Sequence, residues 1–236
     1  MATLLEPAKY LTADERAGLP AKHHRVWAIV TGVEVAAACA AVALDLLVPT
    51  FVLLALAALS LAVRRKGLAS LGFHRAPPGH LVAKMFVFAA AWSTFQLAVT
   101  MPIANHVSGM KTDLSDFKDV EGNIGMLLGL LLLSWTLAAV GEELAYRGYL
   151  QTRMRELFGS GRFGLVVAVV LSSLFFGIAH SEQGVIGVFI ITLDALAFSV
   201  VRYRFKTLWA SVLAHGFNNT IGFIAFFAVG PVYGFW

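Results

Sequence analysis

Two adjacent glutamates follow an almost uncharged stretch, where an ionised side chain has few groups to solvate it. Glu142 and Glu143 come directly after the apolar residues 124–140. Arg147 stands four residues after Glu143, the order and spacing that favour an ion pair on one helix face. Two neighbouring carboxylates repel each other, so Glu142 needs another partner or a proton. Glu142 is therefore a candidate to face a substrate, a water molecule or a metal ion, although an ordinary interfacial glutamate–arginine pair explains the motif equally well.

Three further polar residues lie on or beside apolar stretches. His180 follows the apolar residues 163–179, and His215 and Asn219 lie four residues apart within another such stretch. That spacing places His215 and Asn219 on the same face of a helix, whereas Asn218 points about 100° away. A hydrogen-bonded histidine at a helix end explains His180, and a hydrogen bond between helices explains the other pair. The alternative explanation is that all three residues belong to one catalytic cluster.

A count of residues brings the first two sites together. Glu142 lies 18 residues before Ser160, at a glycine-flanked turn, and His180 lies 20 residues after it. In two antiparallel helices that meet at this turn, a rise of about 1.5 Å per residue places both side chains at nearly the same depth. His215 cannot be placed beside His180 through a simple hairpin. An irregular segment at residues 181–184 would be needed before the next helix.

The composition places these residues in a membrane protein. The 236 residues are 58% hydrophobic and only 14% charged, whereas soluble domains carry about 25% charged residues. Membrane lipid is therefore an expected partner, and nucleic acid is excluded because the chain has no basic helix or long basic run. The expected fold is all-α, a polytopic transmembrane bundle of about seven to eight helices. Its apolar stretches cover residues 26–47, 51–63, 81–104, 124–140, 163–179, 185–201 and 208–229.

Charge predicts how the chain is organised and oriented. We divide it into an N-terminal polar lead-in (1–25), an N-terminal transmembrane region (26–120) and a core that carries the motifs (121–236). The short basic connections mark the cytoplasmic side of a membrane, and seven alternating spans then give a cytoplasmic N-terminus. One segment, residues 146–162, is amphipathic and basic, which predicts an interfacial helix.

Three acidic residues lie at apparent membrane depth without a partner nearby in the sequence. Glu34 and Asp45 belong to the first apolar stretch and Asp194 to the sixth. An ionisable side chain at such depth is costly and is a candidate functional group. The three acids therefore raise a second hypothesis, a small transporter, although helix packing explains them just as well.

Three motifs resemble those of one family of membrane proteases. Residues 142–148 read EELAYRG and resemble the EExxxR motif of the CAAX-processing and bacteriocin-processing (CPBP) family, also called type II CAAX endopeptidases or Abi proteins. Residues 176–180 (FGIAH) match its FxxxH motif, and residues 215–219 (HGFNN) match its HxxxN motif. The motifs occur in that order on apolar stretches, and the resemblance covers about residues 120–230.

The resemblance implies an intramembrane endopeptidase of the CAAX type. The compact chain without a recognisable targeting signal favours a bacterial cytoplasmic membrane as its location. The resemblance implies that Glu142 and His180 activate the attacking water. It assigns stabilisation of the oxyanion to His215 and Asn219, and a structural role to the pair Glu143 and Arg147. The substrate would be a prenylated C-terminal tail, a bacteriocin-like precursor or another membrane-anchored peptide. A non-catalytic immunity or scaffold protein on the same fold is the alternative.

The sequence leaves a metal-dependent mechanism open. Glu142, His180 and His215 form a reasonable zinc set with one position free for water, and the protein would then be a metalloprotease. The usual HExxH helix is absent from the sequence. A serine or cysteine nucleophile is excluded, because the chain has no GxSxG motif and its single cysteine, Cys39, lies far from the three motifs.

Overall fold

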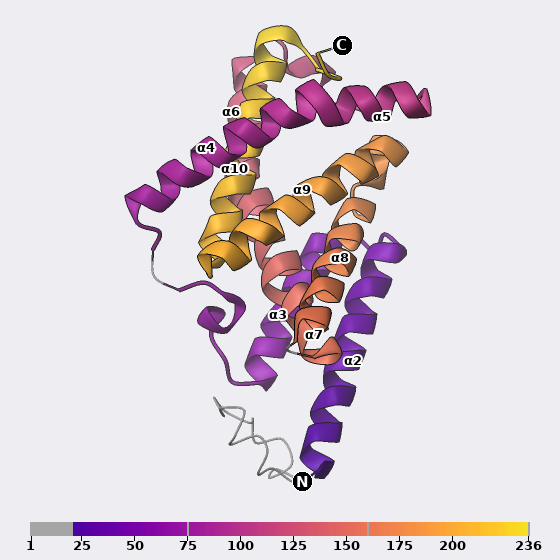
Figure 1. The fold of residues 1–236 in the computed structure, drawn as a ribbon, viewed down its shortest axis with the longest axis vertical. Coiled ribbons are helices and arrows are strands. Elements are labelled where there is room, and N and C mark those ends of the chain that lie inside the picture. The colour runs from indigo at the N-terminus through magenta and orange to yellow at the C-terminus, as the bar shows by residue number, and fades with distance from the viewer. Residues whose placement is uncertain (1–20, 75, 160, 236) are drawn as a thin grey trace.

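The computed structural model describes residues 21–74, 76–159 and 161–235, and these contain helices and no strand (Figure 1). The predicted all-α class is confirmed. Residues 1–20 of the predicted lead-in and the turn residue Ser160 lie outside the described residues. The main helices are α2 (Ala21–Ala43), α3 (Pro49–Val63), α4 (Gly79–Phe95), α5 (Met101–Ser108), α6 (Ile124–Leu133), α7 (Gln151–Phe158), α8 (Arg162–Ile178), α9 (Gly184–Phe205) and α10 (Leu208–Val229).

Helical elements of the π and 3₁₀ types join or continue the main helices. The π-helical elements are η3 (Gln96–Thr100) and η5 (Ser134–Leu150). The 3₁₀-helical elements are η2 (Leu68–Leu71), η4 (Ser115–Val120) and η6 (Ser181–Gln183). The 3₁₀ turn η6 is the irregular segment that the sequence required between His180 and the next helix. The π-helical elements make longer rods of their neighbours, because η3 joins α4 to α5 and η5 joins α6 to α7.

The protein is an integral membrane protein by the length and composition of its helices. Within the described chain, five helical segments are long and apolar enough to span a bilayer, and α3 and α8 are shorter apolar helices. The long segments are Arg25–Ala43, Gly79–Ser108, Ile124–Phe158, Ser181–Phe205 and Leu208–Val229. Together with α3 and α8 they account for the seven apolar stretches of the sequence, and successive segments run in alternating directions (Figure 1).

Two expectations from the sequence are wrong. The basic segment after Tyr146 is not an interfacial helix, because η5 and α7 continue α6 as one rod and bury the aromatic face of the segment. Tyr146 and Tyr149 pack in a cluster with Leu53 and Phe176 and are almost fully buried. Asp45 is not inside a helix: α2 ends at Ala43, and Asp45 lies exposed in a turn with a φ of 47°.

The buried apolar side chains form two main clusters. One joins α2, α3, α7 and α8 and contains the tyrosines of η5, and the other joins α4, α9 and α10 around Phe198 and Leu213. A smaller cluster centred on Ala139 connects η5 to the start of α10. The rod formed by α6, η5 and α7 therefore passes between the two packed halves, and its middle section carries the paired glutamates.

The π-helical element η5 is unusually long, and an arginine from another helix caps its end. The amide of Gln151 donates to the carbonyl of Tyr146, five residues back, whereas α7 returns to bonds four residues back. A change from the π to the α pattern leaves one carbonyl without an amide donor. Arg202 of α9 donates Nη1 to the carbonyl of Arg147 and also to Gln151 Oε1 at 2.7 Å. A buried cation thus replaces the missing donor.

The contact between α8 and α9 provides a test of the packing. A Cβ on Gly177 would lie 2.1 Å from Thr192 Oγ1 and 2.6 Å from the carbonyl oxygen of Val188. We expect Gly177→Ala to separate these helices and to lower the free energy of unfolding by about 1–3 kcal/mol, the usual cost of overpacking. Thermal unfolding in detergent, followed by exposure of the Cys39 thiol, measures the change.

The matched control is Gly129→Ala, because a Cβ at that position meets nothing within 4 Å. Adding Thr192→Ala to Gly177→Ala removes the nearest atom and should recover part of the lost stability. Equal midpoints for Gly177→Ala and Gly129→Ala would contradict this account of the helix contact.

Candidate functional site

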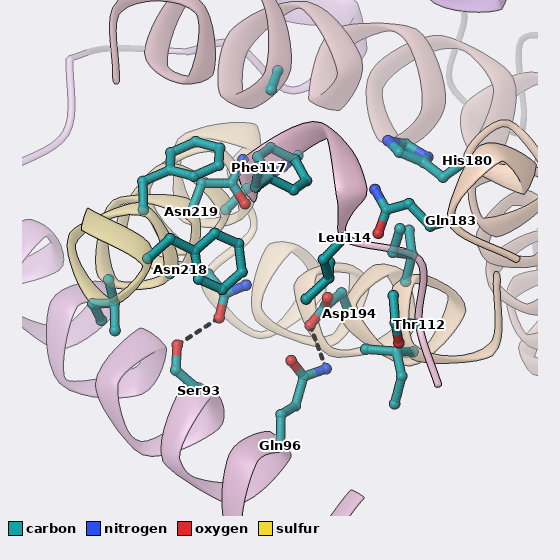
Figure 2. A pocket seen from close by; sticks show the side chains of 18 of the residues that line it. Ser93, Gln96, Thr112, Leu114, Phe117, His180, Gln183, Asp194, Asn218 and Asn219 are labelled. Carbon is teal, nitrogen blue, oxygen red and sulfur yellow. Dashed lines mark hydrogen bonds between the residues drawn. The ribbon is translucent and has the colours of Figure 1, made fainter. Parts of the chain in front are cut away.

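A cavity of about 400 Å³ brings the candidate residues of all three motifs together. Glu142 of η5, His180 after α8, and His215 and Asn219 of α10 all line it. Figure 2 shows His180 and Asn219 on different sides of this cavity. Four polar residues that are up to 77 positions apart in the sequence therefore share one space inside an apolar bundle. The depth that residue counting predicts for Glu142 and His180 agrees with this arrangement.

Glu143 is the fully buried centre of an ionic cluster. Its Oε1 lies 3.2 Å from Arg147 Nη1 and 3.0 Å from His215 Nδ1. The guanidinium of Arg147 lies over the ring of Phe176, 4.1 Å from the centroid. The spacing of the motif predicted the pair with Arg147, but no local spacing indicated that His215 belongs to it. Because Glu143 faces these two partners, the adjacent Glu142 points elsewhere and lines the cavity.

The geometry of His180 defines which ring nitrogen is available. Nδ1 lies 2.9 Å from the carbonyl oxygen of Phe176 in the last turn of α8. A carbonyl only accepts hydrogen bonds, so Nδ1 carries the hydrogen, and Nε2 of the neutral ring is an acceptor. This hydrogen bond is the helix-end interaction that a purely structural role of His180 predicts. It also orients the ring and leaves Nε2 free to bind a water molecule.

A glycine next to His215 brings α10 close to η5. A Cβ on Gly216 would lie 2.6 Å from the ring of Trp135, so only glycine fits there. Trp135 Nε1 donates to Thr220 Oγ1 at 3.1 Å, and the ring of His215 stacks on Phe198 with centroids 5.2 Å apart. The HGFNN sequence therefore combines a side chain of the cavity with the close contact that holds its helix in place.

The helix α4 and the element η3 that continues it add Ser93 and Gln96 to the cavity, and the sequence did not link either to it. Asp194 Oδ1 accepts hydrogen bonds from Trp92 Nε1 at 2.6 Å and from Gln96 Nε2 at 2.8 Å. Ser93 Oγ donates to Asn218 Oδ1 at 2.7 Å (Figure 2). The partners of Asp194 lie about 100 positions away, so no local spacing could reveal them. Its only signal was a carboxylate within an apolar stretch.

The other two intramembrane acids of the sequence also have structural explanations. Glu34 pairs with Arg64 at 2.5 Å and lies 3.6 Å from Arg153 Nε, far along the rod from the cavity. Asp45 is exposed in a turn. The transporter hypothesis relied on unpartnered acids at membrane depth, and these three residues no longer provide that support.

The donors do not form a metal site as they are arranged. Among the described residues, no group of three His, Cys, Asp or Glu side chains could hold a metal ion. His215 directs Nδ1 to Glu143, and Nδ1 of His180 is bound by a backbone carbonyl, so Nε2 of each ring stays free. Glu142, His180 and His215 are not grouped as zinc ligands in this arrangement, so the zinc set stays a prediction and no step of the mechanism passes through a metal.

Comparison with known proteins identifies one family. Residues 124–221 match the family described as type II CAAX prenyl endopeptidase Rce1-like. The matched region starts with α6 and ends within α10, so it contains every residue of the three motifs. Neither the curated proteins nor the solved structures gave a match.

The two adjacent glutamates should respond differently to substitution. Arg147→Ala leaves the carboxylate of Glu143 buried with half of its ionic partners, and removing one member of a buried pair costs about 3–5 kcal/mol. Glu142→Gln removes a charge that lines a cavity, so we expect little change in stability. Thermal unfolding of the purified variants in detergent measures both effects. Similar midpoints for Arg147→Ala and the unsubstituted protein would contradict the assignment of Glu143 as the structural carboxylate.

Proposed function

We propose that this chain, which carries a type II CAAX prenyl endopeptidase (CPBP) domain at residues 124–221, is an intramembrane endopeptidase. The observation that carries the proposal is the shared cavity of Glu142, His180, His215 and Asn219. It combines a carboxylate and an imidazole that could activate water with further groups that could bind an oxyanion. Its position within a membrane bundle suits a substrate that is itself anchored in the membrane.

In the proposed reaction, Glu142 acts as the general base. Its carboxylate takes a proton from a water molecule while the water oxygen attacks the carbonyl carbon of the scissile peptide bond. Nε2 of His180 accepts a second hydrogen bond from that water and orients it. The proton held by Glu142 then passes to the nitrogen of the leaving amine as the carbon–nitrogen bond breaks. The products are a carboxylic acid and an amine, which become a carboxylate and an ammonium when the second hydrogen of the water passes from the acid to the amine, and Glu142 returns to its ionised form.

His215 and Asn219 would stabilise the oxyanion that forms during attack. The side-chain amide of Asn219 offers N–H donors. Nδ1 of His215 is bound to Glu143, so His215 donates to the oxyanion through Nε2 when its ring carries both hydrogens. Glu143 is the adjacent anion that would balance the charge of such an imidazolium. Hydrogen bonds in a cavity that excludes bulk water are stronger than in solution.

The family implies a prenylated CAAX-type substrate, and we retain bacteriocin-like and other membrane-anchored peptides as alternatives. The cavity supports this class because apolar side chains surround its polar groups. These include Leu97, Met101, Ile190, Ile221, Phe223 and Phe226. Such a lining binds apolar peptide side chains or hydrocarbon, while a few polar groups fix the orientation of the bond.

A non-catalytic scaffold on the same fold is the second candidate. The observation that favours it is that some motif residues hold helices together, since His215 joins α10 to η5 through Glu143. In that case His215→Ala and Asn219→Ala would act mainly by unfolding the bundle. Variants that stay folded and lose cleavage would instead support the enzyme.

A cleavage assay in proteoliposomes tests the proposed base. We expect Glu142→Gln to lower the rate of peptide cleavage by about 10²–10⁴-fold, the usual contribution of a general base. We expect Asn219→Ala to lower it by about 10²–10³-fold, as for loss of an oxyanion donor. Asp119→Asn, an exposed carboxylate outside the cavity lining, is the control and should retain full activity. Full activity in Glu142→Gln would exclude the mechanism.

Metal dependence is tested by chelation. Because the described residues contain no three-residue ligand set, we expect cleavage to persist after incubation with 1,10-phenanthroline and gel filtration. The non-chelating isomer 1,7-phenanthroline is the control for binding of the reagent itself. Loss of cleavage with the first reagent only, reversed by added zinc, would show that the cavity rearranges to bind a metal.

A further inference from the structure

Two polar side chains of the cavity use only part of their hydrogen-bonding capacity. Asp194 of α9 accepts both of its hydrogen bonds through Oδ1, from Trp92 and Gln96. Asn218 of α10 accepts one hydrogen bond through its own Oδ1, from Ser93. Among the described residues, no partner binds Oδ2 of Asp194 or Nδ2 of Asn218. Both side chains line the cavity and are only partly buried, so a ligand in the cavity can reach these two atoms.

The groups that hold these side chains lie on one helical rod. Ser93 belongs to α4, and Gln96 is the first residue of η3, which continues α4. Both are buried, and their spacing of three residues places them on the same face of the rod. Each hydrogen bond fixes the orientation of the side chain that accepts it. Figure 2 shows both bonds beside this rod, whereas Asn219 and His180 lie farther from it.

The two free groups are complementary to the main chain of a peptide. Oδ2 of Asp194 accepts hydrogen bonds and Nδ2 of Asn218 donates them, and an extended peptide offers both N–H donors and carbonyl acceptors along its edges. The partners Ser93 and Gln96 lie about 4.5 Å apart along the rod, at about 1.5 Å per residue. An extended chain rises about 3.3 Å per residue, so main-chain groups of neighbouring residues span that distance.

Helix packing explains only one atom of each side chain. A link from α9 to the rod needs one acceptor atom, and so does a link from α10. The second polar atom of each faces a largely apolar cavity, where an unpaired polar group lowers stability. Among the described residues, no lysine or arginine lines the cavity, so Asp194 has no cation of the protein to pair with there. An N–H group of a bound peptide would supply the missing donor.

From these contacts we infer that Asp194 and Asn218 bind the main chain of the substrate next to the cleaved bond. Asp194 accepts a hydrogen bond from one amide N–H of the peptide, and Asn218 donates to one of its carbonyl groups. The inference rests on the proposed function and adds two substrate-binding residues to it. Because all peptides share these main-chain groups, the pair holds the peptide in place without selecting its side chains. A prenylated CAAX-type tail, which the family implies, meets this requirement.

Ester substitution in the substrate tests the hydrogen bond to Asp194. The probe is a prenylated CAAX-type peptide in proteoliposomes, and each derivative replaces one amide N–H, other than that of the cleaved bond, by an ester oxygen. We expect one ester position to lower kcat/KM by about 10–100-fold, as for loss of a hydrogen bond to a charged group. Asp194→Asn keeps Oδ1 as the acceptor for Trp92 and Gln96 and presents a donor to the cavity. In this variant kcat/KM for the amide peptide should fall, and the same ester should cause no further loss.

Two variants on the same rod and on α10 complete the comparison. Thr94→Ala is the matched control, because Thr94 is exposed between Ser93 and Gln96 and lies outside the cavity lining. It should retain full activity and the full response to the ester. Asn218→Asp keeps an acceptor for Ser93 but cannot donate through its carboxylate, so it should lower kcat/KM for every peptide.

Equal kcat/KM for the amide peptide and all esters in the unsubstituted protein would overturn the inference without any variant. An equal loss with the ester in Asp194→Asn would also overturn it, as would full activity in Asn218→Asp. Binding of the labelled peptides to Glu142→Gln in detergent repeats the ester comparison without catalysis. If no peptide is cleaved while this binding still distinguishes the ester, the proposed function fails and the binding role of Asp194 stands.

Discussion

The structure depends on a single carboxylate that is buried in a membrane and bound from two sides. Glu143 has no exposed surface and lies against Arg147 and His215. A charge in this environment is tolerated only when it is paired, so η5 and α10 must lie side by side. That arrangement directs the adjacent Glu142 to the cavity and also fixes the ring of His215. One motif thus places a buried, paired carboxylate directly beside a carboxylate that lines the cavity.

The backbone of η5 shows how the rest of the bundle supports this cluster. A π-helix is weaker than an α-helix and is found mostly as single turns at functional sites, whereas here it extends over 17 residues. Its end is held by Arg202, and Gln151 beside it donates to Ser172 and Ser199 at 2.9 and 3.0 Å. Two other helices, α8 and α9, therefore fix the end of the element that carries both glutamates.

The sequence predicted those features that follow from local spacing and composition. The apolar stretches predicted the helices, and the spacing of four residues predicted the pair of Glu143 and Arg147. Contacts between distant segments could not be read in this way, as shown by the bond of His215 to Glu143 and by the donors to Asp194. The segment after Tyr146 was misplaced because its charges suggested an interface, whereas Arg147, Arg153 and the tyrosines are buried. The end of α2 was misplaced because apolar residues continue through the turn at Asp45.

For the proposed protease, the size of the cavity limits the shape in which a peptide could be cut. An α-helix with its side chains is about 10 Å across, so a volume of about 400 Å³ corresponds to roughly one helical turn. A longer helical segment could not reach Glu142 without giving up its internal hydrogen bonds. The region around the cleaved bond must therefore bind in an extended form. Peptides that unwind readily there, because they contain glycine or proline, would be preferred over stable transmembrane helices with the same local sequence.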